Sequence, residues 1–275
     1  MYSEMSDPRE APWRFTVGEG PLIAVAVHNG HAIRQDIAEF LALSPRDRLR
    51  EEDPYTGRWT TIAPSRFVVE RSRFEVDLNR PREKAVYLDP VDAWGLSVWK
   101  EPLPDAIVQE SLRLYDAFYD RLEGMLSTLL IRHERVVVFD LHSYNHRRGG
   151  SDGPLADPAA NPEINVGTGT MPRDVWAPVV DRFMDDLRSW RFRGRQLDVR
   201  ENVRFQGGEL PRWVHTTFPG RACALAVEVK KFFMDEWTGA ADEPMIEELG
   251  RALGSTVPGI LEALGAGVHA HRTLG

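Results

Sequence analysis

The amino-acid sequence predicts an α/β protein in which helices pack on a central sheet. Three short apolar runs, at residues 22–27, 136–139 and 224–229, have the composition of strands that are buried on both faces. Long amphipathic patterns with the period of a helix lie between these runs. The alternation of the two patterns indicates layers of helix and sheet rather than separate all-α and all-β domains.

The predicted elements begin after a polar N-terminal arm, residues 1–20, which contains several prolines and glycines and has room for one early edge strand. The first buried strand, at 22–27, ends at His28. Residues 32–42 then place apolar side chains on one helical face, and Ser44-Pro45 interrupts this pattern. We expect a strand, a loop and a helix in that order.

The next segments repeat this alternation. A second strand is predicted within residues 66–80, where apolar and polar residues alternate from Phe74 to Leu78. The strongest helical pattern covers 104–133 and leads directly into the strand at 136–139.

The second half of the chain starts with a long loop. Residues 146–172 are rich in Gly, Pro, Asp and Asn, and a loop of this length in a compact domain usually serves function. An amphipathic helix follows at 173–191, and the last buried strand lies at 224–229. The closing helix, 241–264, is expected to break near Pro258.

Length and composition limit the class of protein. A chain of 275 residues with 42% hydrophobic residues can bury a large core, and we expect one domain over residues 21–275. The single cysteine, Cys223, excludes an internal disulfide, and neither an apolar leader nor an apolar run of about 18 residues is visible. The net charge of −8 argues against a nucleic-acid partner. We expect a cytoplasmic protein without membrane contact, whose oligomeric state stays open.

Polar side chains stand at the carboxyl ends of the predicted strands. His28 follows the first strand, His142 follows the run at 136–139, and Glu228 lies in the last strand. In an open α/β sheet, ligands gather outside the carboxyl ends of the strands, so we expect these three side chains to be neighbours. Imidazole nitrogens and carboxylate oxygens are ligands of catalytic zinc, which keeps one position open for water. The sequence therefore predicts one zinc ion held by His28 and His142.

Two residues compete to be the third metal ligand. His31 lies three residues after His28, but Gly30 between them predicts a tight turn in which the two rings need not converge. Asp53 lies in an acidic stretch before Pro54 that would ordinarily be a solvated loop. A carboxylate would complete the two-histidine, one-carboxylate set of hydrolytic zinc sites. We favour Asp53 and keep His31 as the alternative.

Glu228 is predicted to be buried on at least one face of its strand, because apolar residues surround it. A buried carboxylate is costly unless it is paired, for example with Lys230 or Lys231, or held for function. Beside a metal ion, a glutamate can take a proton from an attacking water and pass it to a leaving amine. We favour this role as general base.

A cluster of charged and amide side chains occurs between residues 72 and 81. Its members are Arg73, Asp77, Asn79 and Arg80. The planar guanidinium group suits a carboxylate bidentately, and an asparagine beside it adds donors. The alternative is a surface cluster of salt bridges, and the residues alone do not decide between the two.

Six segments occur in the order of the motifs of the N-formylglutamate amidohydrolase family, and the chain resembles this family from about residue 21 to residue 240. Three of these regions also resemble aspartoacylase and succinylglutamate desuccinylase, more distant relatives. The resemblance implies a carboxypeptidase-like, three-layer α/β/α fold with a mostly parallel or mixed sheet and one zinc ion. The six segments are residues 27–30, 73–81, 140–143, 163–167, 205–208 and 227–229.

The resemblance implies roles for the metal-binding and catalytic residues. His28 and His142 match metal-binding histidines, and Glu228 matches the catalytic glutamate. Aspartoacylase-type relatives have a glutamate three residues after the first histidine, where this chain has His31. The third ligand therefore stays open between Asp53 and His31.

The resemblance also implies how a substrate is held. Asn79 and Arg80 match the pair that binds the substrate carboxylate. Arg73 matches the arginine that polarises the scissile carbonyl, with Arg71 close enough in sequence to compete. Residues 145–150 are more basic than a formyl pocket needs, which suits a second acidic group, a larger acyl group or a peptide.

The function expected from the sequence is zinc-dependent hydrolysis of the amide bond in an acidic N-acyl amino acid. The small-molecule substrate would be N-formyl-L-glutamate or a close analogue. One alternative is a metallopeptidase that trims a terminal or γ-linked acidic residue from a peptide. Another is a non-catalytic binding protein of the same fold. Comparing small substrates with peptides separates the first alternative, and metal occupancy separates the second.

Overall fold

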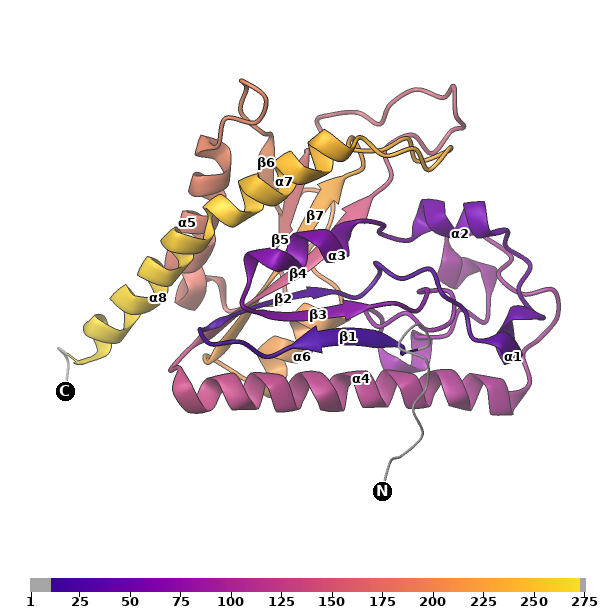
Figure 1. Cartoon of the computed structure of the whole chain (residues 1–275), viewed down its shortest axis with the longest axis horizontal. Helices are drawn as coiled ribbons and strands as arrows, with labels where there is room; N and C mark the ends of the chain where they lie inside the picture. The colour runs from indigo at the N-terminus through magenta and orange to yellow at the C-terminus, as the bar shows by residue number, and fades with distance from the viewer. Residues whose placement is uncertain (1–10, 273–275) are drawn as a thin grey trace.

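The computed structural model describes residues 11–272, with side chains as far as residue 265 (Figure 1). The strands in this part of the chain are β1 (Trp13–Thr16), β2 (Leu22–Ala26), β3 (Ser65–Val69), β4 (Val136–Tyr144), β5 (Ile164–Gly167), β6 (Val199–Glu201) and β7 (Ala222–Lys230). They form one sheet in the order β1-β3-β2-β4-β7-β5-β6. Strands β3, β2, β4 and β7 are parallel, whereas β1 and the β5–β6 pair run antiparallel to them.

Helices cover both faces of this sheet, which confirms the predicted α/β architecture (Figure 1). On one face lie α4 (Asp105–Arg132) and α6 (Glu209–Thr217). The other face carries α3 (Thr56–Trp59), α5 (Arg173–Ser189), α7 (Glu243–Ser255) and α8 (Val257–Arg272). Shorter elements are α1 (Gln35–Ala38), α2 (Pro45–Glu51) and the 3₁₀ turns Thr60–Ile62, Arg82–Lys84 and Pro90–Ala93. No helix within residues 11–272 is both long and apolar enough to span a bilayer.

Two apolar cores form between the sheet and its helical layers. Ile23 and other β2 side chains pack on Phe118 of α4 in one core. In the other, Phe139 of β4 faces Phe183 of α5 with ring centroids 6.0 Å apart. Central strands that are covered on both faces are apolar throughout, which is why the runs at β2, β4 and β7 were visible in the sequence.

Several predicted elements are confirmed. The helical patterns at 104–133 and 173–191 correspond to α4 and α5. The closing helix breaks between α7 and α8, next to Pro258. An edge strand, β1, lies within the predicted N-terminal arm, whose residues 1–10 are outside the described residues.

The helix predicted at 32–42 is wrong for most of its length, since only α1 is helical. Each flank is tied to another segment of the chain. Ala32 forms a parallel bridge with Arg71, and Leu41 forms an antiparallel bridge with Trp99. These backbone contacts over long sequence distances compete with the helix and prevail over the local pattern.

The strand predicted within 66–80 is right only at its start, in β3. From Phe74 to Leu78 the chain turns, and the amide of Asp77 donates to the Ala85 carbonyl. Apolar and polar side chains are both buried here, so their alternation does not mark the two faces of a strand. The apolar ones enter apolar cores, Glu75 pairs with Arg34, and Asp77 meets charged partners described below.

The long loop predicted at 146–172 contains a strand that the sequence did not reveal. β5 pairs antiparallel with β7, with Asn165 opposite Glu228. Its four residues are too few for a clear alternating pattern. The short strand β6 and the helix α6 were also missed.

The parallel strands determine where a site can form. β2, β4 and β7 are neighbours in the sheet and run in the same direction. Their carboxyl ends therefore meet at one edge, the place where ligands bind in open α/β sheets.

Candidate metal centre and active site

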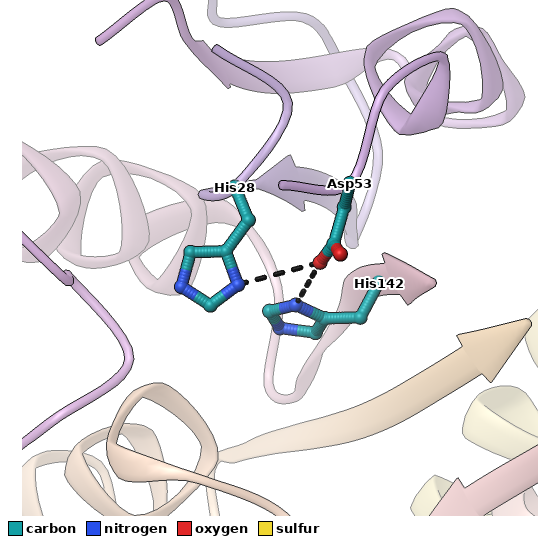
Figure 2. Close-up of side chains that lie close together, drawn as sticks. All are labelled: His28, Asp53 and His142. Carbon is teal, nitrogen blue, oxygen red and sulfur yellow. Dashed lines mark hydrogen bonds and ion pairs between the residues drawn. The ribbon is translucent and has the colours of Figure 1, made fainter. Parts of the chain in front are cut away.

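Two histidines and one aspartate converge at this edge (Figure 2). His28 lies just past β2, His142 lies in β4, and Asp53 follows α2. Asp53 Oδ2 lies 3.3 Å from His28 Nδ1 and 3.0 Å from His142 Nδ1. All three side chains are buried. The group forms from three segments that are distant in sequence.

Backbone contacts and a buried lysine place Asp53. The amide of Asp53 donates to the His28 carbonyl at 2.9 Å. Lys231 Nζ donates to the carbonyls of Arg50 and Glu52 at 2.6 and 2.7 Å, and to Asn145 Oδ1 at 2.9 Å. A cation is favourable at the C-terminal end of a helix, here α2. Burial nevertheless lowers the pKa of Lys231.

Each histidine is oriented by a second carboxylate. His28 Nε2 lies 2.6 Å from Asp77 Oδ1, and His142 Nε2 lies 2.8 Å from Asp140 Oδ1. An imidazole that donates its Nε2–H to a carboxylate keeps a lone pair at Nδ1. This arrangement is typical of histidines that bind a metal ion.

The donor atoms fit a zinc ion. With both Nε2–H groups engaged, two Nδ1 lone pairs and the Asp53 carboxylate face one another. His28 Nδ1 is buried, and no hydrogen-bond partner lies within the described residues. Three acceptors around one point repel one another unless a proton or a metal ion lies among them. Two imidazole nitrogens and one carboxylate oxygen form a donor set that zinc prefers at catalytic sites.

The charges around the centre also favour a cation. Burial alone would raise the pKa of Asp53, but the neighbouring His142 and His28 side chains outweigh it and lower this pKa. Burial would lower the pKa of His142, but the charges of Asp140 and Glu228 raise it well above its usual value. The group therefore stabilises positive charge at its middle, which a divalent ion would supply.

The structure separates the two candidates for third ligand. His31 lies outside the group, and its Nδ1 contacts Glu52 Oε2 at 2.5 Å. Its side chain is 41% exposed, whereas that of Asp53 is 3% exposed. The geometry favours Asp53.

Glu228 lies directly opposite His142 across the β4–β7 pairing and lines the same cavity. Its carboxylate has no hydrogen-bond or ion-pair partner within residues 11–265. The two lysines suggested as partners point elsewhere, since Lys230 donates to Asn161 and Lys231 to the contacts above. Burial raises the pKa of Glu228 to about 7. A carboxyl group with this pKa can both take up and release a proton near neutral pH.

Arg73 also lines the cavity, and four groups hold it there, one of them the Glu51 carbonyl, which accepts from Nη1 at 3.3 Å. Its Nη2 donates to Asp77 Oδ2 at 2.7 Å, and its Nε donates to the Tyr87 hydroxyl at 3.1 Å. The guanidinium lies over the Trp94 ring at 4.8 Å. Asp77 thus contacts both His28 and Arg73, and these charges lower its pKa well below the usual value against the effect of burial. Arg71 does not line the cavity.

Asn79 and Arg80 reach the cavity from the same turn. Asn79 Oδ1 accepts from the Leu210 amide at 2.9 Å and so caps α6. A Cβ at Gly208 would lie 2.5 Å from the Asn79 side chain, so only glycine fits there without displacing it. Arg80 Nη2 donates to the Asp92 carbonyl at 3.2 Å, and its side chain is 36% exposed. Its Nε lies 3.8 Å from Asp77 Oδ2, and Nη1 has no hydrogen-bond partner among the described side chains.

The cavity has a volume of about 360 Å³. This lies at the lower end of the range for small-molecule pockets, about 300–1,000 Å³. Of the basic stretch at 145–150, only Asn145 and Arg148 line it. The amides of His146 and Arg147 instead donate to Glu236, which turns this part of the loop away.

Sequence reasoning missed several residues of this site. Asp140 lies two residues before His142 in the same strand, and this spacing places both on one face, so the signal was present. Lys231 was considered only as a partner of Glu228, and its contacts with the end of α2 were not predicted. Arg204 and Tyr144 also line the cavity, and no local pattern marked them.

Comparisons with known proteins agree with this description. The family model described as N-formylglutamate amidohydrolase matches residues 20–233. A crystal structure of N-formylglutamate amidohydrolase from Ralstonia eutropha JMP134 superposes with a TM-score of 0.70 at 20% identity, covering 96% of this chain and 99% of that one. A gene product from Agrobacterium tumefaciens gives 0.64 at 18% identity, covering 92% and 97%. No curated protein sequence matches the chain.

Proposed function

Because this chain belongs to the N-formylglutamate amidohydrolase family, we propose that it hydrolyses the amide bond of an acidic N-acyl amino acid, with N-formyl-L-glutamate as the first candidate. The observation that carries the proposal is the buried group of His28, Asp53 and His142 beside the carboxylate of Glu228, within one cavity. The three-residue group would hold one zinc ion. When bound there, zinc supplies Lewis acidity toward water and toward the acyl carbonyl.

Glu228 is the proposed general base. Its carboxylate takes a proton from the attacking water and returns it to the nitrogen of the leaving amino acid. Its pKa of about 7 suits both transfers near neutral pH. The absence of a fixed partner for this carboxylate within the described side chains leaves it available for this exchange.

Arg73 is proposed to polarise the acyl carbonyl. Contacts with Asp77, Tyr87 and Trp94 fix the guanidinium before a substrate arrives. Donors that are already oriented stabilise developing negative charge without reorganisation in the transition state. Asp77 also orients His28, so it would fix the position of the metal ligand relative to the polarising arginine.

Arg80 and Asn79 are proposed to bind the substrate carboxylate. Arg80 lines the cavity, and its Nη1 donates no hydrogen bond to another described residue. Asn79 uses its carbonyl oxygen to cap α6, so the amide Nδ2 is the part left for the substrate. A planar guanidinium beside an amide recognises a carboxylate with defined orientation.

The cavity size favours this function over the peptidase alternative. A volume of about 360 Å³ suits an N-acyl amino acid better than an extended peptide. A peptidase would release acidic residues from peptides faster than it hydrolyses formylglutamate. Assaying both substrate classes with one protein preparation decides between them.

The test is release of glutamate from N-formyl-L-glutamate by zinc-loaded protein. The controls are protein stripped by a chelator and the same protein after zinc is restored. Release that disappears on stripping and returns with zinc supports the proposal. Stoichiometric zinc binding without hydrolysis of any N-acyl amino acid would contradict it.

A further inference from the structure

Arg204 lines the active-site cavity, and the proposed function assigns no role to its positive charge. It lies in the loop between β6 and α6. The other arginines there have carboxylate neighbours: Arg73 and Arg80 lie 2.7 and 3.8 Å from Asp77, and Arg148 lies 3.5 Å from Glu51. No carboxylate pairs with Arg204 in the part of the chain described with side chains. An arginine without a counter-ion inside a ligand cavity is a candidate for binding an anionic ligand.

A buried asparagine fixes the backbone of Arg204. Asn165 Oδ1 accepts from the amides of Val203 and Arg204 at 3.0 and 2.8 Å, and Asn165 Nδ2 donates to the Phe205 carbonyl at 2.8 Å. Asn165 is fully buried and pairs with Glu228 across β5 and β7. The position of Arg204 is therefore tied through one strand pair to the proposed general base.

Two aromatic rings orient the Arg204 side chain. Its guanidinium carbon lies 5.7 Å from the centroid of Tyr144 and 5.4 Å from that of Phe205. Contact with ring faces restricts the plane of the guanidinium and leaves its edge, which carries the donors, unoccupied. A guanidinium whose donors are unoccupied can bind a carboxylate with two parallel hydrogen bonds.

We propose that Arg204 binds the side-chain carboxylate of a dicarboxylic N-acyl amino acid, while Arg80 binds its α-carboxylate. The proposal rests on the proposed function and names the residue that makes the enzyme selective for an acidic side chain. It replaces the basic loop at 145–150 as the source of this selectivity, because His146 and Arg147 do not line the cavity and Arg148, which does, lies beside Glu51. Arg204 is a substrate-binding residue and takes no part in proton transfer.

The experiment compares N-formyl-L-glutamate with N-formyl-L-glutamine, which differ only in the charge and donors of the side chain. For Arg204→Gln, kcat/KM for the glutamate substrate should fall about ten- to a hundredfold, mainly through KM, as expected for loss of a charged hydrogen bond. The value for the glutamine substrate should stay within about threefold. Arg204→Lys should fall between wild type and Arg204→Gln, because lysine keeps the charge without the fork.

The matched control is Arg212→Gln, an exposed arginine of α6 that pairs with Glu209 and does not line the cavity. It should leave the ratio of the two kcat/KM values unchanged. If Arg204→Gln lowers both values in parallel, the residue only supports the loop, and the proposal is wrong. If Arg204→Gln leaves both values unchanged, the proposal is wrong as well.

Binding of L-glutamate and L-glutamine, the expected amino-acid products, separates this proposal from the proposed function. Calorimetric titration of zinc-loaded protein reads the Arg204 contact without turnover. A preference for glutamate that Arg204→Gln abolishes supports the proposal even if no N-formyl substrate is hydrolysed. Hydrolysis without any such preference supports the function and rejects the role of Arg204. If there is no hydrolysis and no preference, both fail.

Discussion

The two halves of β4 are equally buried and differ in what surrounds them. Residues 136–139 are valines and a phenylalanine that contact the two apolar cores. Further along the same strand, Asp140 and His142 contact each other, and His142 also contacts Asp53. Burial thus does not distinguish core from site in this molecule. The first half is stabilised by apolar contact, and the second half is tolerated only because its polar groups are paired and can surround a cation.

β7 shows the same division. Its residues up to Val227 are apolar and buried, and Glu228 then faces the cavity. If the two ends of the sheet have separate roles, substitutions at the amino end should change stability and leave the chemistry intact. Substitutions at the carboxyl end should do the reverse.

The largest effect is expected for Glu228→Gln at the carboxyl end. This variant should retain zinc and lose about 10²- to 10⁴-fold in kcat, because glutamine cannot accept the proton. Steady-state kinetics and metal analysis of the purified variant test this. Glu134→Gln, an exposed glutamate just before β4, is the matched control and should be fully active. Full activity of Glu228→Gln would reject the assignment of the base.

Phe139→Ala tests the amino end. Removing this fully buried ring should lower the free energy of unfolding by about 3–5 kcal/mol, because it leaves a cavity against α5. Denaturant unfolding of the metal-free protein measures the change. The exposed Ile131, changed to alanine, should alter stability by less than about 0.5 kcal/mol. A similar loss for both variants would contradict the placement of the core.

His215 sharpens the comparison because it is a buried histidine without a carboxylate. Its Nε2 accepts the amide of Ala224 in β7 at 3.0 Å, and burial lowers its pKa to about 4. The unfolded chain binds a proton there below about pH 6.5, so the free energy of unfolding falls as the pH drops from 6.5 toward 4. The loss reaches about 3 kcal/mol, at about 1.4 kcal/mol for each pH unit.

Urea unfolding between about pH 7 and pH 4.5 tests this titration. In His215→Gln the side chain does not titrate, so stability should depend less on pH than in the wild type. The variant will be less stable at neutral pH, and only the slope bears on the prediction. Equal slopes in both proteins would show that His215 is not held neutral.

The smallest effect is expected for Asp140→Asn, which keeps the shape of the side chain that orients His142. Zinc affinity should fall about 10- to 100-fold, because an amide is a weaker acceptor for the Nε2–H than a carboxylate. Competition with a chelating dye measures the affinity. Asp120→Asn, an exposed position on α4, is the control. Unchanged affinity would mean that Asp140 does not strengthen zinc binding by His142.

Much of the fold could be predicted because the central strands have a distinctive local sequence. A strand covered on both faces must be apolar, and a long helix must show its stripe, so β2, β4, β7, α4 and α5 followed from local pattern. The segment from Phe74 to Leu78 could not be read correctly, since its alternation is that of a strand. Its turns depend on contacts with partners such as His28 and Ala85, which no local pattern contains.

Part of the site could also be predicted from the sequence. His28, His142 and Glu228 stand at strand ends, where topology alone brings them together. Asp53 was favoured on ligand chemistry, and its position depends on Lys231, which is far away in sequence and binds the carbonyl of the preceding Glu52. Arg204 could not be recognised, because its position depends on Asn165 in a strand that was itself missed.

The lone thiol of the chain has a practical consequence. Cys223 is fully buried in β7, and burial raises its pKa, so it is a poor nucleophile in the folded state. It pairs in register with Val137 of β4, so reagent can reach it only when the middle of the sheet opens. The rate of thiol labelling therefore reports opening of the sheet directly, with no engineered probe. Because the proposed zinc ligands contain no sulfur, the same reagent would leave the metal centre untouched.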